Sequence, residues 1–158
     1  TDEKNVKMFE MFKIYTRTEL QSRTEIILEN YSKIINIEAL TMLDMAKKQI
    51  LPAGMGFAKE LADSVNAKKA AGVSADLEKK LADKVSALNA GIEDAIDDLD
   101  AKLIGVADED GYEATARYYR NSVFASMQNL RAVADELETI TPEKEWPFPT
   151  YGDLLFRV

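Results

Sequence analysis

Apolar residues recur at intervals of three and four along nearly the whole chain, and no segment of useful length alternates with a period of two. Because an α-helix brings residues three and four apart onto one face, this pattern predicts helices and argues against a sheet. The cleanest run follows Ser74, the expected N-cap of its helix. Its members are Leu77, Leu81, Val85, Leu88, Ile92, Ile96, Leu99 and Leu103. The sequence therefore predicts an all-α fold.

Turn-forming residues divide the chain into parts of one helical domain, 1–158. We expect an apolar helical arm over 1–15, a long helix over 16–71, helices over 74–104 and 111–140, and an extended tail over 141–158. Thr16 and Glu19 have the spacing of a capping box, as do Asp110 and Glu113, and Gly72 suits a helix C-terminus. Helices of about 30 residues, on the order of 45 Å long and joined by short turns, predict an antiparallel bundle.

Pro52 lies inside the long helical pattern. A proline there removes an amide donor and clashes with the carbonyl of Lys48, and Gly54 and Gly56 add backbone freedom. Local rules therefore predict either a kink or a break at this point.

The first half of the long helix carries more apolar residues than a monomer should expose. A helix over 16–71 would be on the order of 80 Å long and would outrun its partners. We therefore expect this half to be covered by the arm, the tail, another subunit or a missing domain. The candidate packing or interface residues here are Ile27, Tyr31, Ile34 and Ile35.

The tail combines prolines with large apolar side chains. Pro147 and Pro149 hold the backbone extended, so a helix cannot begin before about Thr150. Burial of the apolar side chains would contribute on the order of 10 kcal/mol as an upper bound, so the tail should dock. Its candidate packing residues are Trp146, Phe148, Tyr151, Leu155 and Phe156.

Composition restricts the chemistry. The chain has neither cysteine nor histidine, which leaves only carboxylates for acid–base or metal work. With 28 acidic and 20 basic residues its net charge is −8, the wrong sign for binding nucleic acid. No apolar run approaches the roughly 20 residues that span a bilayer, and there is no basic, apolar leader. We expect a soluble cytoplasmic chain with no catalytic, cofactor-binding or metal-binding residues.

Three polar clusters are candidate sites. The acids Glu93, Asp94, Asp97, Asp98 and Asp100 flank an apolar stripe, which is typical of a solvated face. The turn over 108–111 fails as a calcium loop, because Val106 and Arg117 would fall at ligand positions. Arg117, Arg120 and Arg131 are expected to form interhelical salt bridges, although an acidic partner could use them.

Two segments resemble a known family. The tail reads WPFPTYGDLLF over 146–156, and residues 19–52 read ELQSRTEIILENYSKIINIEALTMLDMAKKQILP. Both are similar to the C-terminal end of type III glutamine synthetases. The resemblance implies a parent enzyme that joins ammonia to glutamate with ATP and Mg²⁺ or Mn²⁺, in stacked rings of subunits. Its catalytic motifs lie in an upstream core and are not found here, so no catalytic residue is carried over. The resemblance also favours a kink at Pro52 over a break.

The leading hypothesis is a structural or assembly domain, inactive alone, whose partners are the parent catalytic core and neighbouring subunits of a homo-oligomer. The alternative is an independent helical adaptor that captures an amphipathic helix. A free-standing metalloenzyme is a third hypothesis.

Overall fold

The computed structural model describes residues 2–149 and 151–156, with the side chains at 151 and 152 left undescribed. Every element in this part of the chain is helical, which confirms the predicted all-α class. In order they are α1 (Glu3–Met11), α2 (Arg17–Met45), η1 (Ala46–Ile50), α3 (Leu51–Ala70), α4 (Asp76–Gly105), η2 (Val106–Asp108), α5 (Tyr112–Tyr118), η3 (Tyr119–Val123), α6 (Phe124–Glu138) and α7 (Tyr151–Phe156). Of these, η1 and η3 are π-helical turns and η2 is a 3₁₀ turn.

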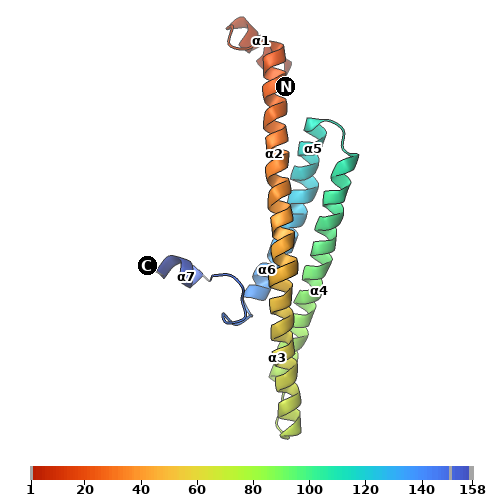
Figure 1. Ribbon diagram of the computed structural model, residues 1–158, viewed down its shortest axis with the longest axis vertical. Helices are drawn as coiled ribbons and strands as arrows, with labels where there is room; N and C mark the ends of the chain where they lie inside the picture. Colours follow the sequence, from red (N-terminus) through yellow and green to blue (C-terminus); the bar gives the residue numbers. More distant parts are fainter. Residues whose placement is uncertain (1, 150, 157–158) are drawn as a thin grey trace.

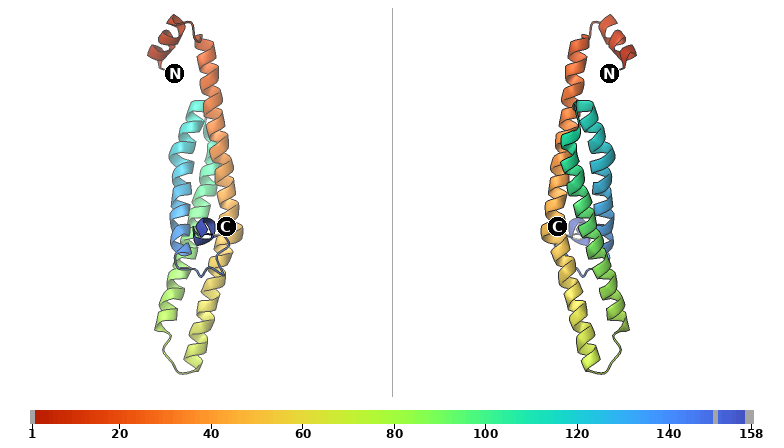
Figure 2. Two further views of the ribbon diagram at one scale, coloured as in Figure 1. Left: turned by 90° about the vertical axis from the view of Figure 1, so that its left-hand side faces the viewer. Right: turned by 90° about the vertical axis from the view of Figure 1, so that its right-hand side faces the viewer.

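The molecule is an elongated bundle built on one very long helix (Figure 1). Helices α2 and α3 continue through η1 without a gap, and α4 returns along them in the opposite direction. Helices α5 and α6, joined through η3, then run antiparallel to α4. The N-terminal part of α2 extends beyond the ends of its partners and carries α1 (Figure 2).

The long helix does not break at Pro52. The π-turn η1 precedes the proline, and the Leu51 amide donates to the carbonyl of Ala46, five residues back. A wider turn of this kind rearranges the carbonyls next to a residue that has no amide donor of its own. The helix therefore bends gently in this region and continues as α3 (Figure 2).

Some of the helix caps predicted from the sequence are confirmed and others are wrong. The capping box is confirmed, because the Thr16 amide donates to Glu19 Oε2 at 2.8 Å and the Glu19 amide donates to Thr16 Oγ1 at 3.3 Å. The bond from the Thr16 amide, and after it the bond that the Thr16 hydroxyl donates to the same carboxylate at 2.9 Å, lower the pKa of Glu19. Gly72, with φ of 72°, ends α3 as expected. Its amide donates to Lys69, and the Val73 amide donates to Lys68, the pattern of a Schellman motif.

Two expected caps are wrong. Ala75, not Ser74, occupies the N-cap of α4, and the Ser74 hydroxyl instead accepts a long 3.4 Å bond from the Asp76 amide. Gly111, with φ of 86°, is the N-cap of α5, so Asp110 forms no capping box with Glu113. A sharp turn that needs a positive φ favours glycine at this junction over a side-chain cap.

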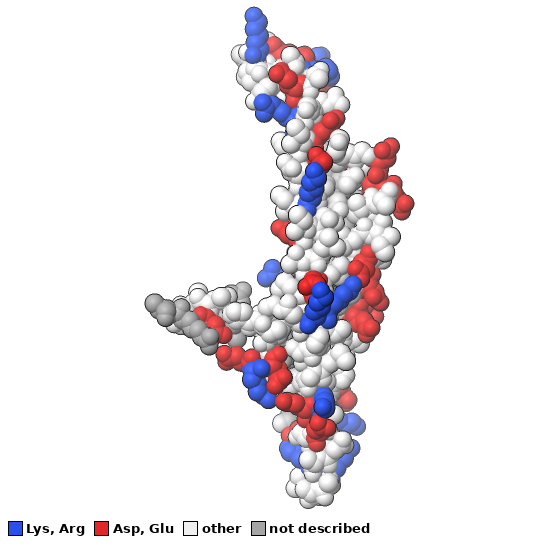
Figure 3. Space-filling view, in the orientation of Figure 1, with Lys and Arg blue, Asp and Glu red and all other residues white. Residues whose placement is uncertain are grey.

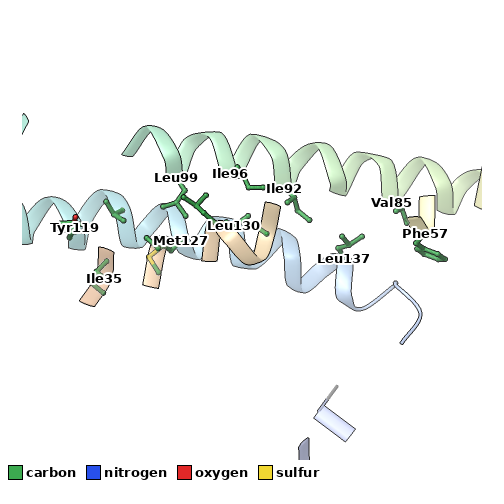
Figure 4. Packing of buried hydrophobic residues seen from close by; sticks show 14 of the residues in the cluster. Ile35, Phe57, Val85, Ile92, Ile96, Leu99, Tyr119, Met127, Leu130 and Leu137 are labelled. Atoms are coloured by element: carbon green, nitrogen blue, oxygen red, sulfur yellow. The ribbon is translucent and has the colours of Figure 1, made fainter. Parts of the chain in front are cut away.

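The core lies between the long helix, α4 and the α5–α6 segment (Figure 4). Each helix contributes the apolar stripe that the period of three and four predicts, so the stripes meet along the bundle axis. Its largest fully buried apolar side chains are Ile92, Leu99, Leu130, Leu137, Val85 and Val123.

Candidate functional site

The four candidate residues of α2 divide between the core and the surface. Ile35 is buried and Tyr31 is half-buried, whereas Ile27 is 67% exposed and Ile34 is 54% exposed. The first half of α2 is therefore not without a partner, because α5 packs against it. Tyr119 closes this contact by donating its hydroxyl to Asn36 Oδ1 at 3.1 Å, and burial raises the pKa of that tyrosine.

The surface of α2 that faces away from the bundle is apolar. We define the α2 outer face as Ile26, Ile27, Ile34 and Ile37, which are all more than half exposed. Ile26 and Ile37 were not among the predicted interface residues, although their spacing of eleven residues, about three helical turns, placed them on one side. Apolar residues on the side of a helix opposite its core are typical of a partner surface.

The tail docks at its start and not at its end. Trp146 packs against the core cluster and meets Phe148 edge to face, with ring centroids 6.3 Å apart. Lys144 reaches α3, where both oxygens of Glu60 accept from it at 3.1 Å, and this pairing raises the pKa of Lys144. The chain then leads to α7, which projects away from the bundle (Figure 1).

The predicted tail residues therefore have different surroundings. Trp146 and Phe148 are half-buried, but Leu155 is 69% exposed and Phe156 is 81% exposed. The side chain of Tyr151 lies outside the described residues. The end of the tail, α7, therefore does not dock on this chain, and docking of its residues on a partner stays a prediction.

A groove of about 860 Å³ lies between α2, α6 and the start of the tail. Its apolar lining includes Met42, Met45, Ile50, Met127, Trp146 and Phe148. Methionines suit an adaptable binding surface. Met42 and Met45 are both half-buried, and Met42 packs against the core as well as lining this groove. The sequence could not show the groove, because Met127 and Trp146 come from distant segments.

The acidic residues of α4 do not form a metal site. They gather along the edge formed by α4 (Figure 3), and their partners are cations and hydroxyls. Asp98 accepts from Ser126 at 2.6 Å, and Asp100 pairs with Lys47. Within the described ranges, no group of three or more His, Cys, Asp or Glu side chains is placed so that it could hold a metal ion.

The arginines of α5 and α6 pair within their own helices. Arg117 binds Glu113 at 2.7 Å and Arg131 binds Asp135 at 3.4 Å, each one turn away. The expected salt bridges exist, but they are not interhelical. Arg120 instead stacks over the ring of Phe124 at 5.0 Å.

Among residues 2–149 and 151–156, no helix is long and apolar enough to cross a membrane.

Comparisons with known proteins point to one family. The family model described as glutamine synthetase C-terminal domain matches residues 1–69. A glutamine synthetase from Butyrivibrio fibrisolvens is 36% identical over 166 residues, which cover 99% of this chain and 23% of that protein. A type-3 glutamine synthetase from Dictyostelium discoideum is 34% identical, with coverage of 98% and 22%.

A glutamine synthetase from Bacteroides fragilis (strain YCH46) is 27% identical over 91% of the chain. The chain thus spans less than a quarter of the length of the curated relatives it matches. The matches reach from the long helix to the tail, the two segments that first suggested the relationship. The chain belongs to the glutamine synthetase C-terminal domain family.

Proposed function

We propose that this chain is the structural and assembly part of a type III glutamine synthetase and contributes no catalytic group. Catalysis, the ATP-dependent ligation of ammonia to glutamate with Mg²⁺ or Mn²⁺, takes place in a separate catalytic core in the cytoplasm. The chain holds that core and neighbouring subunits in place through its uncovered apolar surfaces. The similarity to glutamine synthetases of Butyrivibrio fibrisolvens and Dictyostelium discoideum supports the parent reaction.

The α2 outer face is the observation that carries this proposal. Its four isoleucines are between 52% and 67% exposed, while the opposite side of α2 already packs in a complete core. Full burial of an isoleucine side chain contributes about 1.5–3 kcal/mol, so covering this face would strongly favour association. A cluster of exposed isoleucines of this kind marks a surface that a partner covers.

The groove and α7 support the same role. Leu155 and Phe156 are exposed on a short helix whose Leu154 lines the edge of the groove, while the segment before them is anchored to α3 and the core. An anchored base with an apolar end is suited to contact a neighbouring domain.

Assembly of a chimeric enzyme tests the proposal. This chain replaces the matching segment of the Butyrivibrio fibrisolvens relative, and Ile27→Asp with Ile34→Asp is introduced into the chimera. We expect smaller particles by size-exclusion chromatography with light scattering, and at least a tenfold loss of glutamine formation. The matched control is Ile104→Asp, since Ile104 is 76% exposed on α4 and lies outside the α2 outer face. A double variant that assembles and works like the control would contradict the proposal.

The methionine-lined groove favours a second candidate, an adaptor that captures an amphipathic helix. Binding to the Butyrivibrio fibrisolvens relative truncated before its matching segment separates the two functions. An assembly domain binds that truncated core, measured by calorimetry, whereas an independent adaptor does not.

A further inference from the structure

We propose that the α2 outer face binds the same face of a second copy of this chain, with the two α2 helices antiparallel and the twofold axis passing near Asn30. The inference rests on the proposed assembly function and names the partner of one of its surfaces. It goes further in stating orientation, register and the charges that select them.

Two charged residues lie on the same side of α2 as the isoleucines. With 100° per residue, Arg23, Ile27, Ile34 and Glu38 fall within roughly 60° of one another around α2. Both charged residues are exposed, and Arg23 stacks on the ring of Tyr15 at 4.6 Å, which holds its guanidinium near the surface of α2. A charged residue therefore flanks the apolar pair at each end.

The order of these four residues along α2 is symmetric about its midpoint. Arg23 precedes Ile27 by four residues, and Glu38 follows Ile34 by four residues. Turning the helix end for end exchanges Ile27 with Ile34 and Arg23 with Glu38. A twofold interface requires this self-complementarity, because each residue of one copy must meet its counterpart on the other.

The charges select the antiparallel orientation. In the antiparallel arrangement Arg23 of each copy meets Glu38 of the other, and Ile27 meets Ile34. In the parallel arrangement Arg23 would meet Arg23 and Glu38 would meet Glu38. Opposite charges favour the first arrangement and like charges penalise the second.

The described neighbours leave Ile27 and Ile34 exposed, while Ile37 and Glu38 border the groove that Leu154 of α7 also lines. Helix α1 lies on another side of α2, where Val6 shares a cavity with Gln21 and Leu28. The same register brings the turn before α2 level with the partner's groove. That turn carries Phe12, 64% exposed, and Ile14, 55% exposed, so the apolar groove and the apolar turn would cover each other.

Cysteine cross-linking tests the orientation, because the chain has no native cysteine. Asn30→Cys and Thr41→Cys both change exposed polar residues on the same side of α2. Near the axis, Asn30→Cys should form a disulfide-linked dimer on mild oxidation. Thr41→Cys should not, since its two copies would lie on the order of 30 Å apart along the helices. Cross-linking of both variants would indicate a parallel pair and overturn the proposal.

Charge reversal tests the register. By sedimentation equilibrium of the 158-residue chain, Arg23→Glu should raise the dimer dissociation constant at least tenfold. Adding Glu38→Arg should bring it back to within about threefold of the unmodified chain. Circular dichroism verifies that each variant keeps its helix content. Failure of the second charge to restore dimerisation would overturn the register.

The two proposals can fail separately. A monomeric chain whose Asn30→Cys variant does not cross-link overturns self-pairing, whereas the proposed function fails if the chimera tolerates Asp at Ile27 and Ile34 or if the chain does not bind the truncated core. The control Ile104→Asp should leave dimerisation unchanged.

Discussion

Gly54 lies where α3 approaches both α4 and α6. A Cβ atom at this position would overlap Asn89 Oδ1 and would lie 2.8 Å from Leu137 Cδ2. Asn89 is itself buried, and its Oδ1 has no hydrogen-bond partner among the described residues. Neither glycine of the 54–56 pair has the positive φ that favours glycine, so the requirement at Gly54 is for space and not for backbone freedom.

Replacing the two glycines should give opposite results. Gly54→Ala should cost about 1–3 kcal/mol of unfolding free energy because Asn89 or Leu137 must move. At Gly56 the nearest atom to a new Cβ is Glu145 Oε2 at 3.9 Å, so Gly56→Ala should be neutral or stabilising by up to about 1 kcal/mol. Urea unfolding followed by circular dichroism measures both. Equal effects of the two substitutions would contradict the close-packing explanation.

At the scale of elements, the long helix tolerates Pro52 because the preceding turn is π-helical and accommodates the departure from regular α-helical hydrogen bonding. The π-turn η1 lies directly before the proline, whose own side chain is exposed. A second π-turn, η3, lies between α5 and α6, where the Phe124 amide donates to Tyr119. Each π-turn shifts the apolar stripe around its helix, so these turns set which residues face the core on either side.

Removing the proline should strengthen this helix. Pro52→Ala supplies an amide donor at an exposed site, and we expect the free energy of unfolding to rise by on the order of 1 kcal/mol. The gain is limited because a proline also restricts the unfolded chain. Chemical unfolding with an unchanged m-value is the measurement. A loss of stability would mean that the π-turn depends on the proline.

Local sequence predicted the elements better than their surroundings. The box between Thr16 and Glu19 was predictable because both partners lie within one turn. The burial of Ile35 was not, because Tyr119 and Val123 of η3, far along the chain, share its core cluster. The N-cap at Gly111 was also missed, since the backbone path between α4 and α5 decided it.

Across the whole molecule, the helices share one core and cannot be stable separately. Leu130 of α6 and Leu99 of α4 are each about 1% exposed or less, and both belong to the cluster that includes Ile35 and Phe57 of the long helix. Association along the bundle gives it its stability, while the N-terminal end of α2 and the helix α7 lie outside it (Figure 1).

Truncation of a shared core residue should therefore destabilise the entire bundle. Leu130→Ala should cost about 2–5 kcal/mol, because the cavity forms where several helices meet. Ile104→Ala removes an exposed side chain and should change stability by less than about 0.5 kcal/mol. Thermal unfolding by circular dichroism and fluorescence of Trp146 should give coincident transitions. Separate transitions would show that the tail unfolds independently of the core.

The sequence by itself determined the all-α class, the apolar stripes, the capping box at Thr16 and the relationship carried by the tail. These depend on residues within a few turns of each other, where helical periodicity and capping act. Tertiary structure alone decided which isoleucines of α2 remain exposed, why Gly54 must be glycine, and that the tail docks through Trp146 while α7 stands apart. Each of these depends on which distant segment arrives at a given face, and packing between helices, not local preference, sets that arrangement.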